Sequence, residues 1–318
     1  MDVPDFNPPA YLRSPHAQTV LSSRVTSTAP SRPAAEHVDL EIARLPDSPR
    51  LTAKLDIVAN ARALVVLIHG WLGDAESTYN VRVAAALNAE GLSTARLVLR
   101  DHGETEALNE GVFNSAKLDE VVAAVEQLHD RASPGATAIV GFSLGGNFAL
   151  RVASARARGI EQCVAVCPVI DPAATVRAID RGWFVYQHYF MRKWRRSLAA
   201  KQNEFPDIYQ LDNALSLSSV SALTDFVVTR HLPFPDANAY YAGYRITDAL
   251  LARAQAQIAI IAAADDPVIP IDDVRSLERR EGLRIFETQR GGHCGHLEGL
   301  QRTWIDRAVT RLITNALD

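Results

Sequence analysis

The sequence Gly-Phe-Ser-Leu-Gly-Gly around Ser143 has the residue types and the glycine spacing of a turn that carries a nucleophilic serine. A glycine lies two positions before the serine, at Gly141, and another two positions after it, at Gly145. An apolar run over 136–140 precedes the motif, and a helix-forming run over 147–153 follows it. A serine in a tight strand-to-helix turn has an exposed hydroxyl, and the flanking glycines remove side chains that would clash. The pattern predicts a nucleophilic serine; the alternative is a glycine-rich turn with an incidental serine.

A nucleophilic serine needs a base to take its proton and an acid to orient that base. In a strand–turn–helix site of this kind the acid follows the serine along the chain. An apolar run over 258–264 leads directly into Asp265 and Asp266, and either aspartate could serve. We favour Asp266, because Asp-Pro-Val-Ile-Pro resembles the usual Asp-x-x-x-Pro turn of the acid. The competing interpretation is that both aspartates cap a helix that begins near Ile271.

The base is expected in a glycine-rich loop after the last strand and before the last helix. A strand is predicted over 283–288, and two glycines then lead into His293. His296 lies three residues further on and competes for the role. We favour His293 because it directly follows the paired glycines, whereas His296 is better placed to begin a final helix, predicted over about 297–316.

Acyl chemistry also needs donors for the oxyanion, each typically worth about 3–4 kcal/mol. The main-chain N–H of Leu144, directly after the serine, is one candidate. The second is expected from the loop 69–73, His-Gly-Trp-Leu-Gly, which follows an apolar strand. We choose the N–H of Trp71, and we expect His69 to be a structural, hydrogen-bonding residue.

The elements that must position these residues follow from hydrophobic patterning. Continuous apolar runs indicate strands buried on both faces, as in a parallel sheet covered by helices. Such runs occupy 63–68, 136–140, 163–169 and 258–264, and helical patterns occupy 79–90 and 115–129 between them. Alternating patterns over 38–42 and 51–58 predict an antiparallel pair at a sheet edge. The order of elements predicts an α/β fold with a mostly parallel central sheet and helices on both faces.

Residues 171–252 interrupt this alternation. They contain helical pieces and no clear parallel strand, which predicts a helical cap inserted into a core made of 35–170 and 253–318. Residues 1–34 are rich in proline and serine with weak periodicity, and are expected to form an irregular N-terminal arm that lies on the body.

The aromatic and then basic segment 183–196 lies inside the predicted cap. It could line an acyl-chain pocket or touch anionic lipid headgroups. The alternative is an ordinary helix that packs its aromatic face on the core. One basic cluster does not by itself predict membrane binding.

Taken together, the serine turn, the His-Gly loop, the Asp turn and the late Gly-Gly-His resemble an α/β-hydrolase, and more specifically its YheT-like branch. The discriminating features are His-Ala-Gln-Thr at 16–19, similar to that branch's His-x-Gln-Thr arm, and Asp-Phe at 225–226 followed by the tyrosines at 240–241. The resemblance spans nearly the whole chain. It implies a serine carboxylesterase or lipase-like hydrolase with the triad Ser143, Asp266 and His293.

The chain departs from this branch after the strand near 95–99. Relatives tend to have Arg-Gly there, and this chain has Arg-Asp-His-Gly at 100–103. The bulky Trp71 also lies near the expected mouth of the site, so no substrate preference is carried over.

The expected reaction is hydrolysis of a small-molecule or lipid ester through a covalent acyl-enzyme. Acyl transfer by the same triad and a non-catalytic hydrolase-fold binding protein are the alternatives. A metal-dependent hydrolase is disfavoured, because His102, His293 and His296 are not accompanied by a ligand-spaced set of carboxylates. We expect no metal and no cofactor.

Composition sets the remaining limits. The 318 residues include 33 Lys+Arg and 37 Asp+Glu, a formal net charge of −4, which offers no positive excess for nucleic acid. Cys163, Cys167 and Cys294 are too few for a disulfide framework, and the first two are expected to be buried free thiols. The acidic N-terminus lacks a signal-peptide pattern, and there is no apolar run of 18 residues. We therefore predict a cytoplasmic protein without a transmembrane segment.

Overall fold

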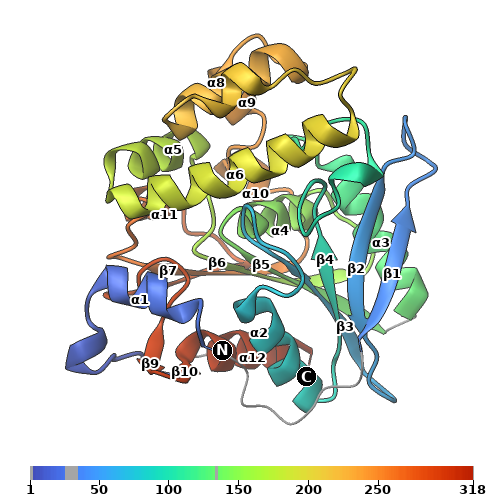
Figure 1. The fold of residues 1–318 in the computed structure, drawn as a ribbon. Helices are drawn as coiled ribbons and strands as arrows, with labels where there is room; N and C mark the ends of the chain where they lie inside the picture. Colours follow the sequence, from blue (N-terminus) through green and yellow to red (C-terminus); the bar gives the residue numbers. More distant parts are fainter. Residues whose placement is uncertain (1–2, 26–34, 133–134, 318) are drawn as a thin grey trace.

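The computed structural model describes residues 3–25, 35–132 and 135–317. An eight-stranded sheet crosses the molecule in the order β1-β2-β4-β3-β5-β6-β7-β8 (Figure 1). Its strands are β1 (Glu36–Glu41), β2 (Arg50–Asp56), β3 (Ala63–Ile68), β4 (Ser93–Val98), β5 (Ala136–Phe142), β6 (Ile160–Val166), β7 (Gln257–Ala263) and β8 (Leu283–Thr288). β2 pairs antiparallel with β1 and β4, and the other neighbours pair parallel. The predicted mostly parallel α/β sheet is confirmed.

Helices cover both faces of the sheet because side chains alternate along each strand. In β3, Leu64 and Val66 belong to one apolar cluster, and Val65 and Leu67 belong to another. The first cluster includes side chains of α3 (Asp119–Ala132) and α4 (Leu144–Ser154). The second includes side chains of α2 (Thr78–Ala89) and α12 (Trp304–Leu317). The continuous apolar strands are therefore sandwiched, as their sequence predicts.

The chain between β6 and β7 is helical. It contains α5 (Pro172–Arg181), α6 (Phe184–Glu204), α7 (Asp212–Leu215), α8 (Val220–His231), α9 (Ala237–Ala242) and α10 (Asp248–Leu251). Figure 1 shows α6, α8 and α9 on the opposite side of the sheet from α2 and α12. We call α5–α10 the helical insertion. Its buried side chains join the apolar cluster of α3 and α4, so it packs continuously onto the core.

The N-terminal arm is more ordered than its composition suggests. Residues 10–12 form a 3-10 turn, and α1 (Pro15–Ser22) is a helix, with the hydroxyl of Ser14 accepting a hydrogen bond from the N–H of Ala17. The expectation of an irregular arm is therefore wrong for these residues, and positions 26–34 lie outside the described residues. The arm does lie on the body: Trp304 Nε1 donates to the carbonyl of Pro4 over 2.6 Å.

The last helix begins later than predicted. α12 begins at Trp304 rather than near 297, and β9 (Leu297–Gly299) and β10 (Arg302–Thr303) form a small hairpin before it. Leu300, which lies inside the predicted helix, is instead outside α12 and 66% exposed. Leu297 instead packs with Leu12 and Val25 of the arm, a tertiary contact that overrides the local helical pattern. Among the described residues, no helix has the length and apolarity needed to cross a membrane.

Candidate active site

The turn between β5 and α4 holds Ser143 in a strained conformation. Its backbone has φ 54° and ψ −117°, a region that non-glycine residues rarely adopt. A Cβ at Gly141 would lie 2.0 Å from the carbonyl oxygen of Gly145, and one at Gly145 would lie 2.2 Å from that of Ile68. Both positions therefore require glycine, as the sequence pattern predicts.

Three of the predicted side chains meet at the carboxyl edge of the sheet. His293, in the loop after β8, has Nε2 at 2.9 Å from Ser143 Oγ and Nδ1 at 2.9 Å from Asp266 Oδ2. Because the carboxylate accepts a hydrogen bond from Nδ1–H, the neutral imidazole has its lone pair on Nε2, which can accept the proton of the serine hydroxyl. The other carboxylate oxygen of Asp266 accepts from the N–H groups of Val268 and Ile269, which fixes its orientation.

The neighbouring aspartate has a different contact. Asp265 Oδ1 accepts a hydrogen bond of 2.9 Å from the N–H of Gly292. Burial, and then the nearby charge of Asp266, raise the pKa of Asp265. Of the two aspartates that the sequence leaves open, it is Asp266 that contacts the imidazole, while Asp265 holds the loop that carries it.

The competing histidine lies beneath the same loop. His296 is fully buried, stacks on Trp304, and has Nε2 at 3.0 Å from Thr288 Oγ1. Burial lowers its pKa to about 4, so it is neutral. It precedes the β9–β10 hairpin and does not begin a helix, which corrects that expectation.

The protonation of His293 reflects opposing effects. Burial by itself lowers its pKa, but the negative charges of Asp266 and Cys294, together with the hydrogen bond to Asp266, raise it from 6.5 to about 9. Its side chain is 12% exposed and that of Asp266 is 2% exposed. The ion pair is thus shielded from water, and attraction outweighs desolvation.

The two predicted oxyanion donors border the same space. Leu144 begins α4, and Trp71 lies in a turn closed by the N–H of Gly73 and the carbonyl of Gly70. The N–H of Gly70 donates to the hydroxyl of Tyr79, so it is not available to a ligand. In the part of the chain that the structure describes, no protein atom accepts from the N–H of Trp71 or Leu144. His69 is buried with both ring nitrogens engaged by main-chain groups, as expected of a structural residue.

A largely apolar pocket opens beside Ser143. Its walls come from the 69–73 loop, α4 and the helical insertion, and they include Trp71, Phe113, Leu144, Phe190, Val227 and Tyr241. Phe190 of α6 stacks on Trp71 with ring centroids 5.4 Å apart, and Trp194 meets Trp71 edge-on at 4.9 Å. Part of the aromatic segment 183–196 therefore lines this pocket. Trp183 and Phe184 are exposed instead, by 42% and 71%.

Sequence reasoning missed two features of the site. The first is a buried ion pair on the pocket wall, in which Lys201 Nζ lies 2.8 Å from Asp101 Oδ1. Nothing in the sequence signals this pairing across 100 positions. The second is direct support of His293 by the arm, where Thr19 Oγ1 accepts from the N–H of His293 over 2.9 Å. The His-x-Gln-Thr signature was the available signal.

Comparisons with known proteins agree with this architecture. Residues 63–300 match the family model described as the alpha/beta hydrolase fold. A 2,6-dihydroxy-pseudo-oxynicotine hydrolase is 16% identical with a TM-score of 0.61, over 89% of this chain and 68% of that one. The esterase Pf2001 of Pyrococcus furiosus is 15% identical with a TM-score of 0.58, over 92% of this chain and 100% of that one. Est1E of Butyrivibrio proteoclasticus, with ferulic acid bound, is 18% identical with a TM-score of 0.56, over 88% and 99%.

Among curated proteins, none matches the sequence of this chain. These three solved structures are all below 20% identity, so their likeness concerns the fold. The family model, in contrast, covers most of the chain, from β3 past the loop of His293. By that match, this chain belongs to the α/β-hydrolase fold family.

Proposed function

We propose that this protein hydrolyses carboxylic esters through a covalent acyl-enzyme, with Ser143 as nucleophile, His293 as base and Asp266 as the orienting acid. The observation that carries the proposal is the pair of 2.9 Å contacts that join the three side chains through one imidazole. They lie beside an apolar pocket that also includes Ser143. This combination provides a nucleophile, a proton acceptor and a place for an acyl group.

The reaction has two halves. Ser143 Oγ attacks the ester carbonyl as its proton passes to His293 Nε2, and the imidazolium then protonates the leaving alcohol. A water molecule next gives a proton to His293 and attacks the acyl-enzyme, and His293 returns that proton to Ser143 Oγ as the acid is released. Asp266 stabilises the imidazolium in both halves. The N–H groups of Trp71 and Leu144 would donate to the oxyanion of each tetrahedral intermediate.

The substrate that we propose is a small-molecule or lipid ester with an apolar or aromatic acyl group. Its support is the aromatic lining from Trp71 and α6. The esterase and hydrolase names of the similar structures agree with this class.

We also propose membership of the YheT-like branch, a cap at 171–252 and a cytoplasmic location; the sequence motifs support the first. We propose that the reaction needs neither metal nor cofactor and that nucleic acid is not a partner.

Acyl transfer to an alcohol would use the same residues, and a binding protein of this fold would typically lack one of them. No contact in the described residues favours either alternative over hydrolysis, so the experiment must discriminate among the three. A fluorophosphonate probe should label the wild type at Ser143 and leave Ser143→Ala unlabelled.

A p-nitrophenyl ester panel of increasing acyl length should then report turnover by the wild type. Ser143→Ala and His293→Ala should lose at least about a thousandfold in kcat. Activity that survives in Ser143→Ala would refute the mechanism. Faster release of p-nitrophenol with added alcohols, together with a new ester product, would identify a transferase.

A further inference from the structure

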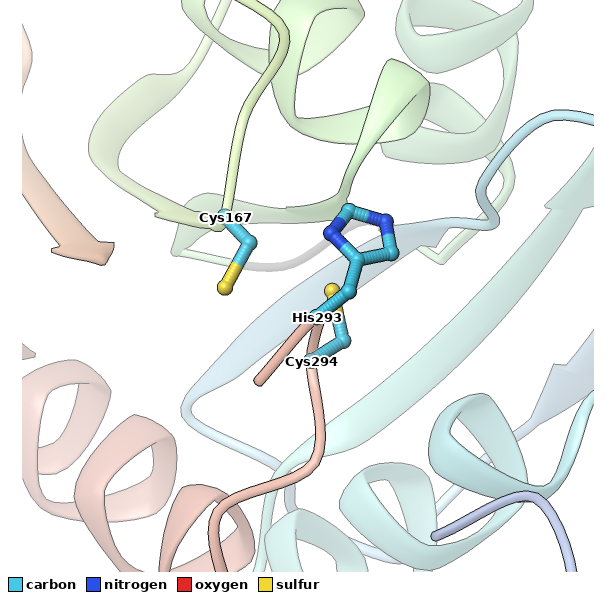
Figure 2. Close-up of side chains that lie close together, drawn as sticks. All are labelled: Cys167, His293 and Cys294. Atoms are coloured by element: carbon cyan, nitrogen blue, oxygen red, sulfur yellow. The ribbon is translucent and has the colours of Figure 1, made fainter. Parts of the chain in front are cut away.

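Two thiols lie beside the imidazole of His293. Cys167 directly follows β6, and Cys294 directly follows His293 itself. The two sulfur atoms and a ring nitrogen of His293 all lie within 4.8 Å of one another. Figure 2 shows both side chains directed toward the space next to the imidazole. The mechanism above uses neither thiol.

The loops that carry the two cysteines lie against each other. Cys167 Sγ is 4.0 Å from the carbonyl oxygen of Gly292, and Cys294 Sγ is 3.7 Å from that of Val166. Each thiol thus contacts the main chain within two residues of the other cysteine. Both cysteines have left-handed backbone, with φ of 45° at Cys167 and 55° at Cys294. The surrounding structure holds these strained turns, and with them the two sulfurs, in proximity.

The two thiols differ in exposure and acidity. Cys167 is 1% exposed, whereas Cys294 is partly exposed. The hydrogen bond between the thiols lowers the pKa of Cys294, and the positive charge of His293 acts in the same direction. The same hydrogen bond, followed by burial, raises the pKa of Cys167. Cys294 is therefore the better thiolate and the one that a small oxidant can reach.

We propose that Cys167 and Cys294 form a reversible disulfide in response to peroxide and that this bond switches off the adjacent site. The thiolate of Cys294 attacks the O–O bond of hydrogen peroxide, forming a sulfenic acid and releasing hydroxide, which takes up a proton to become water. The Cys167 sulfur then attacks the sulfenic sulfur, forming the S–S bond and releasing a second water. Two thiols lose two electrons and two protons, and one peroxide yields two waters.

Formation of the Cys167–Cys294 disulfide would disturb the site because the S–S bond is short. A disulfide needs the sulfurs about 2.05 Å apart, so the two loops must shift or their side chains rotate. Cys294 is joined by one peptide bond to His293, whose ring makes both 2.9 Å contacts of the site. A shift of that loop breaks the alignment with Ser143. The loss of activity rests on the proposed function, whereas formation of the disulfide does not.

The same three groups are also ligands that a soft divalent cation prefers. A cation would have to displace an existing partner, because the two ring nitrogens of His293 face Ser143 and Asp266. The S–S bond forms between the two thiols themselves and uses neither ring nitrogen of His293. The geometry therefore favours the disulfide over a metal site.

The test treats reduced protein with hydrogen peroxide, blocks the remaining thiols with N-ethylmaleimide and maps peptides by mass spectrometry. We expect a Cys167–Cys294 cross-link, at least a tenfold loss of ester hydrolysis, and recovery of both with dithiothreitol. Cys163→Ala is the matched control, since that thiol lies on β6 and is fully buried away from the Cys167–Cys294 pair, and it should behave as wild type. Cys167→Ala should form no cross-link and should leave Cys294 as a sulfenic acid that dimedone traps.

Full alkylation of both thiols in oxidised wild type would overturn the proposal without requiring any variant to fold. Stoichiometric zinc that shields both thiols in the purified protein would also overturn it. A cross-link with unchanged ester hydrolysis would refute the switch. A cross-link in a protein whose Ser143 never reacts with a fluorophosphonate would refute the proposed function and leave the thiol pair standing.

Discussion

The main-chain N–H of His293 donates a hydrogen bond of 2.9 Å to the hydroxyl of Thr19, which lies 274 positions earlier in the chain. Thr19 is itself fixed, because its hydroxyl donates to the carbonyl of Pro15 over 2.8 Å. Next to it, the side-chain amide of Gln18 bonds both main-chain groups of Leu297. Helix α1 therefore positions the loop of the proposed base.

Removing the Thr19 hydroxyl should reduce turnover more than binding. Thr19→Val leaves the N–H of His293 without an acceptor. An unsatisfied buried donor of this kind destabilises the observed position of the loop by about 1–3 kcal/mol. We expect kcat to fall about tenfold with KM within about twofold of wild type, because the pocket is untouched. Thr19→Ser keeps the hydroxyl and should restore most of kcat. An equal loss in both variants would contradict the positioning role.

Activity should rise with pH up to an alkaline limit. The base must be neutral to accept a proton, and its pKa is raised to about 9. Below that value the imidazole is mostly protonated, so kcat/KM should increase about tenfold per pH unit toward a plateau. Asp266→Asn removes the larger of the two charges that raise the pKa of His293 and leaves burial, which lowers it. Imidazole NMR of that variant should show the His293 titration well below its wild-type value; an unchanged midpoint would rule out Asp266 as the cause.

The buried ion pair between Lys201 and Asp101 should matter to stability. Lys201 is 1% exposed and Asp101 is 3% exposed, so removal of one partner leaves the other buried without its ion-pair partner. Lys201→Met should lower the free energy of unfolding by about 3–5 kcal/mol, measured by urea denaturation. Arg196→Met on the same helix breaks only the exposed pair with Glu104 and should cost at most about 1 kcal/mol. Similar losses of unfolding free energy in the two variants would contradict a stabilising role for the Lys201–Asp101 ion pair.

The serine turn should reject a methyl group at Gly145. The added Cβ would lie 2.2 Å and 2.4 Å from the carbonyl oxygens of Ile68 and His69, so the turn cannot close as it does. Gly145→Ala should fail to fold or should unfold at a much lower temperature, as thermal circular dichroism would show. Gly299→Ala has open space around its Cβ and should keep the wild-type midpoint. A normal midpoint for Gly145→Ala would contradict the described turn.

Filling the pocket should shorten the preferred acyl chain. Val227 of α8 is 4% exposed and lines the pocket. Each buried methylene contributes about 0.8 kcal/mol, so wild-type kcat/KM should rise with acyl length until the pocket is full. In Val227→Trp we expect kcat/KM for p-nitrophenyl octanoate to fall at least about tenfold. The value for p-nitrophenyl acetate should change by less than about threefold. Equal losses for both esters would place the acyl group elsewhere.

Much of the site could be predicted from local signals. The strained turn at Ser143 requires glycines, and those glycines are visible in the sequence. Continuous apolar runs locate the strands whose carboxyl ends carry Ser143 and Asp266. The Asp-x-x-x-Pro pattern favours Asp266 over Asp265, and it is the Asp266 carboxylate that contacts His293.

Other features depend on contacts between distant residues. Leu297 fits a helical stripe, yet it packs against the arm, and α12 begins only at Trp304. Lys201 looks like an ordinary lysine on the polar side of a helix, because its partner Asp101 lies 100 positions away. No local periodicity encodes either relationship.

The contacts between the two ends of the chain also bear on how the protein is made. Thr19 and Pro4 are synthesised well before their partners His293 and Trp304, which lie 274 and 300 positions later in the chain. Until His293 has been added, Ser143 lacks its proposed base. A nascent chain that ends before His293 consequently lacks the proposed base, even when residues 3–25 and the serine turn have already been made.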